Sequence, residues 1–135
     1  MKKYLESIGK NSCKAFTSKV NNKEKNKVLK KFFNLIEKNK SKIIKQNKKD
    51  IYFAKRKGLR KNLIDRLELN DKKINEIIKS IKNIIKLKDP TNTILSKWKR
   101  PNGLVIKKTT TPIGVIGVIY ESRPNVTSDV SSLCF

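Results

Sequence analysis

The sequence predicts an α/β protein in which a helical N-terminal layer, residues 1–90, precedes the start of an α/β core, residues 91–135. Two observations lead to this prediction. Apolar residues recur at helical spacing through most of the first 88 residues, with lysine on the opposite side. After Pro90 short apolar runs are separated by Pro and Gly, which is typical of strands and turns. The second segment is too short for a complete α/β domain, so we expect that domain to be incomplete here.

The first three predicted helices are defined by their caps and their apolar stripes. The first is loosely amphipathic, with apolar residues at Leu5, Ile8, Ala15 and Phe16. Asn22 is expected to cap a second helix, and Ser41 a third, because Asn and Ser accept hydrogen bonds from free N–H groups at helix starts. Gly58 is expected to end the third helix, since glycine adopts the left-handed conformation easily.

The clearest predicted helix follows a short helical turn at Leu63–Leu67. Asn70 is its expected N-cap, and Asp89-Pro90 is its expected end, because the residue before proline resists the helical conformation. Its isoleucines repeat at helical spacing: Ile74, Ile77, Ile78, Ile81, Ile84 and Ile85. We interpret this stripe as a core face, since it is shorter than two heptads and a coiled-coil seam is less favoured.

The segment after Pro90 predicts two strands. Thr91–Lys99 reads as a loop, Leu104–Thr111 as a partly exposed strand, and Ile113–Tyr120 as a second strand that is apolar at nearly every position. Strands buried on both faces of parallel sheets have this composition. Gly114 and Gly117 inside the second strand suggest close approach of another backbone or a ligand.

A turn at Glu121–Asn125 and a helix beginning at Val126–Phe135 complete a strand–turn–helix unit. The N–H groups and dipole at such a helix start favour phosphate groups and cofactors. The GxGxxG fingerprint of dinucleotide-binding folds is absent, so an ordinary core strand with a β–α turn is the alternative on spacing alone.

The net charge of +23 leaves two interpretations open. A Lys-rich helical module could bind nucleic acid through counterion release. However, 29 Lys, 14 Asn and 17 Ile all use A/T-rich codons, and only five residues are Arg, the better bidentate phosphate ligand. We therefore favour compositional bias, with nonspecific polyanion binding as its consequence.

The residue types in the sequence also limit which functional sites and which cellular compartment we expect. The chain has no His, which excludes a His-based metal site or a Cys–His nucleophile pair within it. Cys13 and Cys134 are far apart and are expected to be buried, structural thiols. No apolar run is long enough to span a bilayer and no secretion signal is visible, so we expect a cytoplasmic protein with no membrane contact.

A family resemblance sharpens these expectations. The string PIGVIGVIYESRPNVTSDVSSLC, Pro112–Cys134, closely resembles glutamate-5-semialdehyde dehydrogenase, also called gamma-glutamyl phosphate reductase, of the aldehyde dehydrogenase superfamily. The strings KEKNKVL, DIYFAKRKGL, LIDRLELN and KLKDP follow that family's order upstream. LVIKKTTTPIGVIGVIYES matches the family's strand pair leading into the core.

The resemblance implies a fold, a reaction and partners. The fold would be the beginning of a Rossmann-type cofactor domain behind a helical layer. The reaction would be the NADPH-dependent conversion of L-glutamyl 5-phosphate to L-glutamate 5-semialdehyde and phosphate in proline biosynthesis, through a cysteine thiolate. The intact enzyme would be a homo-oligomer that uses Leu104–Thr111 in its oligomerisation sheet.

The resemblance also implies site residues. The matching cofactor-wall positions are Ile119, Tyr120, Glu121, Ser122, Arg123 and Pro124. Asn125 is a candidate oxyanion donor, with a helix N-cap as its alternative role. Arg123 is a candidate phosphate ligand, with an ion pair to Glu121 or Asp129 as the alternative. Cys134 is not expected to be the nucleophile, which in the family lies much further along.

The resemblance therefore predicts the N-terminal part of a reductase, truncated and inactive alone. Two other hypotheses remain: the nucleic-acid-binding module, and a non-catalytic remnant that joins a full-length homologue through its strand pair. Sequence-preferring binding at physiological salt would favour the module, and co-purification with a homologue would favour the remnant.

Overall fold

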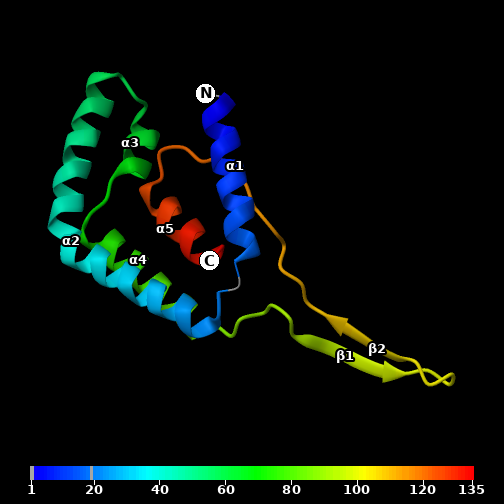
Figure 1. The fold of residues 1–135 in the computed structure, drawn as a ribbon. Helices are drawn as coiled ribbons and strands as arrows, with labels where there is room; N and C mark the ends of the chain where they lie inside the picture. The colour runs from blue at the N-terminus through cyan, green and yellow to red at the C-terminus, as the bar shows by residue number, and fades with distance from the viewer. Residues whose placement is uncertain (1, 19) are drawn as a thin grey trace. The chain divides into compact units, whose positions relative to one another are not determined.

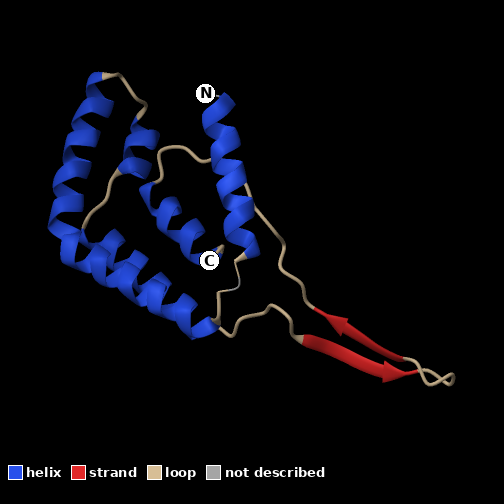
Figure 2. Ribbon diagram, viewed as in Figure 1, coloured by secondary structure: helices blue, strands red, loops and turns tan. Residues whose placement is uncertain are grey.

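The computed structural model describes residues 2–18 and 20–135, and the chain divides into two compact units (Figures 1 and 2). Residues 20–87 and 118–135 form the first, which we call the helical unit. Of the described residues, 2–18 and 88–117 form the second, which we call the hairpin unit.

The helical unit begins with α2 (Asn22–Arg56), a single helix of 35 residues. Its N-cap is Asn21 rather than the expected Asn22, and a capping box closes it: the side chains of Asn21 and Glu24 each accept the other's backbone N–H at 3.0 Å. The predicted break at Ser41 is wrong. Neither Pro nor Gly stands near Ser41, and a polar residue facing outward does not interrupt a helix whose apolar stripe continues on both sides.

Gly58 ends α2 as expected. Its φ of +69° is left-handed, and the N–H groups of Gly58 and Leu59 donate to the carbonyls of Lys55 and Ala54 at 3.0 and 3.1 Å. This pair of bonds is a Schellman motif, which satisfies carbonyls that would otherwise face no partner at the helix end.

The side chain of Asn47 in α2 forms hydrogen bonds with the backbone at residues 67–69. Asn47 is 4% exposed; its Nδ2 donates to the carbonyl of Leu67 at 2.8 Å, and its Oδ1 accepts from the N–H of Leu69 at 2.7 Å. Leu67 is the last residue of α3 (Lys61–Leu67), and Leu69 lies in the connection to α4 (Asp71–Lys86). The buried amide therefore fixes where the chain turns back along α2.

The core of this unit lies between α2 and α4 (Figure 1). Leu29 of α2 packs with Ile77 and Ile81 of α4, and Ile81 is completely buried. Partly buried residues surround this cluster: Phe32, Phe33, Ile36, Leu69, Ile84 and Ile85. The predicted core role of the isoleucine stripe is therefore confirmed.

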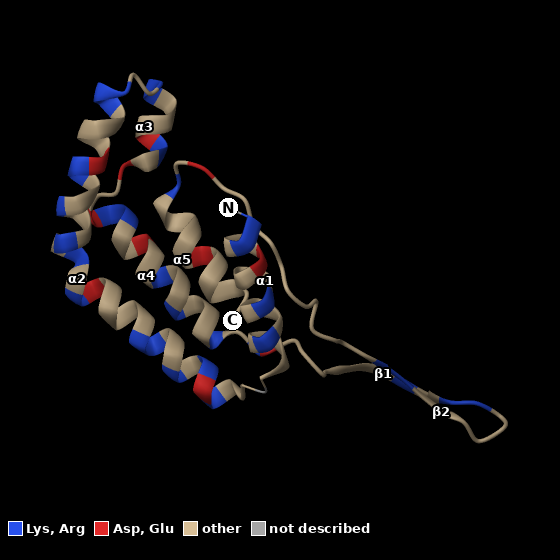
Figure 3. Cartoon of the chain, turned by 45° about the horizontal axis from the view of Figure 1, so that its top comes forward, with Lys and Arg blue, Asp and Glu red and all other residues tan. Residues whose placement is uncertain are grey.

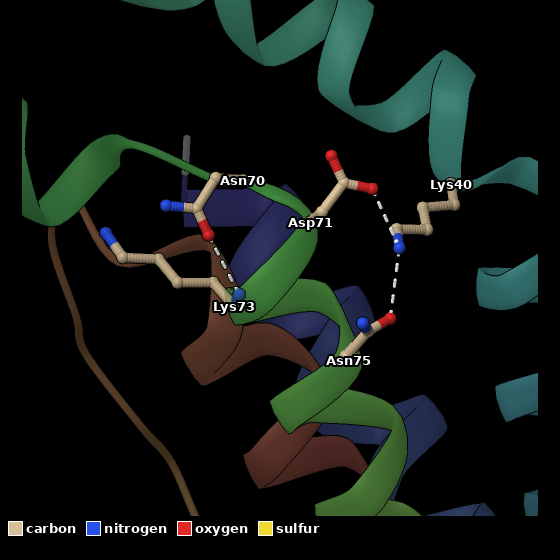
Figure 4. Close-up of polar contacts among 5 residues, drawn as sticks. All are labelled: Lys40, Asn70, Asp71, Lys73 and Asn75. Atoms are coloured by element: carbon tan, nitrogen blue, oxygen red, sulfur yellow. Dashed lines mark hydrogen bonds and ion pairs between the residues drawn. The ribbon is translucent and has the colours of Figure 1, made fainter.

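Polar contacts fix the start of α4 (Figure 4). Asn70 is the N-cap, as predicted, and its side chain accepts from the N–H of Lys73 at 2.9 Å. The Lys40 ammonium lies 2.8 Å from the Asp71 carboxylate and donates to Asn75 Oδ1 at 3.0 Å. The hydrogen bond and charge of Lys40 lower the pKa of Asp71 from its ordinary value of 3.8.

The hairpin unit contains an antiparallel pair, β1 (Ile94–Lys99) and β2 (Val105–Thr109), with Trp98 opposite Ile106. The prediction of a loop at Thr91–Lys99 is wrong for the residues of β1. ILSKWK shows no clear alternation, and its pairing comes from the facing strand rather than from its own pattern. The turn between the strands contains Gly103 at φ +84°. α1 (Lys2–Thr17) also belongs to this unit.

The segment Ile113–Tyr120 is extended but is not a strand, which corrects the prediction. Within the described residues the backbone groups of 111–121 make no backbone hydrogen bond, and no strand lies beside them. A strand requires such a partner. Among the described residues no atom lies within 4 Å of the Cβ position of Gly114 or Gly117, so no other backbone approaches either glycine there. The alternative of a nearby ligand stays a prediction, and the φ of +106° at Gly114 favours glycine.

The last element is α5 (Pro124–Leu133), which begins two residues earlier than predicted. It packs on α4 and buries two of its three serines, Ser128 and Ser132, which lie one turn apart. Among the described residues no helix is both long and apolar enough to cross a membrane.

Candidate functional site

The candidate site is the turn that leads into α5, which lies wholly in the helical unit. Ser122 has φ +50°, a left-handed conformation that is uncommon for residues other than glycine. Arg123 is the N-cap of α5 but its side chain makes no capping bond, and Pro124 occupies the first position of the helix. The first turn of α5 contains no acidic residue. The positive end of the helix dipole is therefore open to an anion.

A pair of hydroxyls bridges this turn. The phenol oxygen of Tyr120 lies 2.7 Å from Oγ1 of Thr127, and either hydroxyl can donate. Tyr120 precedes the turn and Thr127 stands in the first half of α5, so the bond joins the two ends of the turn.

Asn125 is the second residue of α5, so its alternative role as an N-cap is wrong. Proline at the preceding position starts the helix one residue before Asn125, because its fixed φ suits the first turn. Nδ2 of Asn125 donates to Oδ2 of Asp129 at 3.2 Å. A carboxylate only accepts, so this bond sets the orientation of the amide and leaves a second N–H on Nδ2.

The structure also locates the expected cofactor-wall residues. Ile119 is fully exposed and Tyr120 is about half exposed. Glu121 and Arg123 are exposed, whereas Ser122 and Pro124 are partly buried. Among the described residues Arg123 makes no ion pair with Glu121 or Asp129, so the alternative role for Arg123 is not observed. The role of Ile119–Pro124 as a cofactor wall stays a prediction.

A pocket of about 330 Å³ opens beside Asn125 and Asp129. The end of α3 and the first half of α4 form its other wall, with both charges represented: Arg66, Glu68, Leu69, Lys73, Glu76, Ile77 and Ser80. Nζ of Lys73 donates to the carbonyls of Asp65 and Glu68 at 3.0 and 2.7 Å, so this cation is committed to the end of α3.

Both cysteines differ from the expectation of buried thiols. Cys13 and Cys134 are free and exposed. Cys134 stands at the C-cap of α5, where the helix ends and its side chain is no longer covered. Over residues 2–18 and 20–135 no cluster of three or more His, Cys, Asp or Glu residues could hold a metal ion.

The sequence did not predict two hydrogen bonds of the site. The Asn125–Asp129 bond has a sequence signal, because residues four apart share a helix face. The Tyr120–Thr127 bond has none, since it depends on how the intervening turn folds.

Comparison with known proteins shows which family the chain is similar to. No family model matches the chain. Gamma-glutamyl phosphate reductase of Dictyoglomus turgidum is 46% identical over 134 residues, which are 98% of this chain and 32% of that protein. The chain is homologous to the N-terminal part of gamma-glutamyl phosphate reductase. It spans about a third of the length of the curated relatives that it matches.

Solved structures agree. The crystal structure of gamma-glutamyl phosphate reductase from Thermotoga maritima matches with a TM-score of 0.87 at 39% identity, over 96% of this chain and 32% of that one. The enzyme from Saccharomyces cerevisiae matches with a TM-score of 0.88 at 32% identity, over 94% and 33%. The predicted α/β class and family resemblance are thereby confirmed.

The comparisons do not support the nucleic-acid-binding module. The basic residues are also dispersed along the chain, since Lys or Arg occurs on every helix from α1 to α4 and on both strands (Figure 3).

Proposed function

We propose that this chain supplies the N-terminal part of a cytoplasmic, NADPH-dependent gamma-glutamyl phosphate reductase. The reaction would convert L-glutamyl 5-phosphate to L-glutamate 5-semialdehyde and phosphate in proline biosynthesis. The observation that carries the proposal is the match over 98% of the chain to reductases of that name.

The surface of the chain supports the proposal. Within the described residues six hydrophobic residues are buried, whereas 23 large hydrophobic ones are exposed, including most of Ile113–Tyr120. Single exposed hydrophobic residues are ordinary, but a contiguous exposed run such as Ile113–Tyr120 marks an interaction surface. Packing against the remaining two thirds of a reductase would cover it and would give the extended segment strands to pair with. In a homo-oligomer, packing against a second copy of the chain would likewise cover Leu104–Thr111.

The turn before α5 fits a dinucleotide cofactor. The uncapped helix start, the absence of acidic residues in its first turn and the guanidinium of Arg123 all favour phosphate groups. Ile119–Pro124 would form a wall along the cofactor, with the exposed Ile119 side chain as its apolar part. Bound NADPH supplies the hydride for the reduction.

Asn125 would act on the substrate. One N–H of its amide is held by Asp129, and the second would donate to the oxygen on which charge develops as the acyl phosphate reacts. We assign the nucleophilic thiolate to neither Cys13 nor Cys134, so the chain alone is expected to be inactive.

A graft tests the proposal. Residues 1–135 replace the matching N-terminal third of the Thermotoga maritima reductase, and NADPH-linked turnover of the grafted enzyme is measured spectrophotometrically. The expected result is activity in the graft and none in the separate 135-residue chain. Asn125→Ala in the graft should lower kcat about 10²-fold or more, the usual effect of losing an oxyanion donor.

The control is Asn34→Ala, an exposed position of α2 outside the site, which should retain the activity of the parent graft. A graft that folds and assembles like the Thermotoga enzyme but shows no turnover would contradict the proposal. Turnover by the separate 135-residue chain would contradict the assignment of the thiolate.

A further inference from the structure

We propose that the hydroxyl pair of Tyr120 and Thr127 is a positioning device that holds the turn Glu121–Arg123 in the shape that faces the cofactor. The inference rests on the proposed function, which assigns this turn to the cofactor wall. The two oxygens lie 2.7 Å apart across the turn.

The turn needs such a device because its backbone is strained. Ser122 at φ +50° lies in the left-handed region, which is unfavourable for a residue other than glycine. Strained residues persist only where their surroundings hold them. Without a restraint, the Ser122 backbone would relax and redirect the N–H groups and side chains on either side.

The Tyr120–Thr127 bond is the restraint that the structure offers. The other hydrogen bonds around the turn join residues from Arg123 onward: Val126 to Arg123, Ser128 to the Asn125 carbonyl, and Asn125 to Asp129. Among the described residues the hydroxyl pair is the only hydrogen bond that the structure shows between the chain before Ser122 and α5.

The exposed position of the hydroxyl pair indicates that the pair contributes more to function than to the stability of the fold. Both residues are exposed, and water competes for hydroxyls there, so the bond contributes little to the free energy of folding. Holding a loop in its bound shape, however, reduces the ordering cost of binding. The pair should therefore affect cofactor affinity more than the chemical step.

The test uses the grafted reductase described above. Tyr120→Phe and Thr127→Val should each raise KM for NADPH roughly 2- to 10-fold, the effect of one hydrogen bond, with kcat changed less than about 2-fold. Thr127→Ser keeps the hydroxyl and should retain the parent KM. Ser122→Gly removes the strain and should restore much of the loss in Tyr120→Phe.

Ser131→Ala is the matched control. It removes a hydroxyl bond of 2.6 Å to the Thr127 carbonyl on the same helix but leaves the turn untouched, so KM should not change. An unchanged KM in Tyr120→Phe, or an equal rise in Ser131→Ala, would overturn the inference.

A second readout separates this inference from the proposed function. In the 135-residue chain, Tyr120→Phe should lower the backbone ¹⁵N order parameters of Glu121–Arg123, whereas Ser131→Ala should not. If the parent graft is inactive but the order parameters fall in Tyr120→Phe, the proposed function fails and the positioning of the turn stands. Equal order parameters in the two variants would overturn the inference whatever the graft does.

Discussion

Asn47 illustrates a residue whose importance its type does not reveal. It stands in a lysine-rich stretch of α2 among other asparagines, yet it is buried and bonded to the backbone on both sides of Glu68. The sequence could not single it out, because the partners are backbone groups about 20 residues away that any sequence would provide.

Replacing Asn47 tests this role. Asn47→Ala should lower the free energy of unfolding by about 1–3 kcal/mol, because it leaves the Leu67 carbonyl and Leu69 N–H without their partner. Urea titration followed by circular dichroism measures the change. Asn34→Ala on the same helix is exposed and should stay within about 0.5 kcal/mol of the parent. Equal effects of the two variants would contradict the role.

Asp71 makes a prediction about pH. Lys40 lowers its pKa in the folded chain below the ordinary 3.8, so the folded state binds the proton less readily than the unfolded state. The ion pair therefore stabilises the fold above pH 3.8, and this contribution is lost as pH falls through the lowered pKa. Asp71→Asn should shift the urea midpoint downward near neutral pH and leave it nearly unchanged in acid.

Lys40→Met provides the matched comparison for Asp71. It should remove the same pH-dependent part of the stability, and adding Asp71→Asn to it should have a smaller effect than in the parent. Additive effects of the two substitutions at neutral pH would show that the 2.8 Å contact does not couple them.

At the scale of elements, the end of α2 depends on a backbone conformation. Gly58→Ala should destabilise the chain by about 1 kcal/mol, because alanine resists the left-handed φ of +69°. Gly117→Ala is the control, because the added Cβ has no other atom within 4 Å and the backbone at residue 117 is not left-handed. Thermal unfolding compares them, and equal melting temperatures for the two variants would argue against the Schellman end.

Elements with strong local signals could be predicted from the sequence, and those defined by distant partners could not. Asn70 and the isoleucine stripe determine the start and the buried face of α4 within one short segment. The pairing of β1 depends on β2, and the pairing expected for Ile113–Tyr120 depends on strands that the described residues do not contain.

The same limit applies to the candidate site. The turn and the helix after it could be predicted from the sequence, because proline and asparagine mark a turn and a helix start, although the helix begins two residues earlier than expected. The strand expected before the turn is not formed, and Asn125 is not the N-cap. The left-handed Ser122 and the hydroxyl pair across the turn could not be predicted, since both depend on the three-dimensional path of the turn.

For the whole molecule, the composition is a poor guide to function. A net charge of +23 suggests a polyanion partner, but the basic residues are spread over α1–α4 and the hairpin, and the homology points to a reductase.

Genetic complementation tests the central claim most directly. The graft of residues 1–135 onto the Thermotoga maritima reductase is expressed in a bacterium that lacks its own gamma-glutamyl phosphate reductase and needs added proline. We expect growth without proline for the graft, and none for the 135-residue chain alone. If the grafted protein accumulates in soluble form and the cells still require proline, this chain does not work as the N-terminal part of the enzyme.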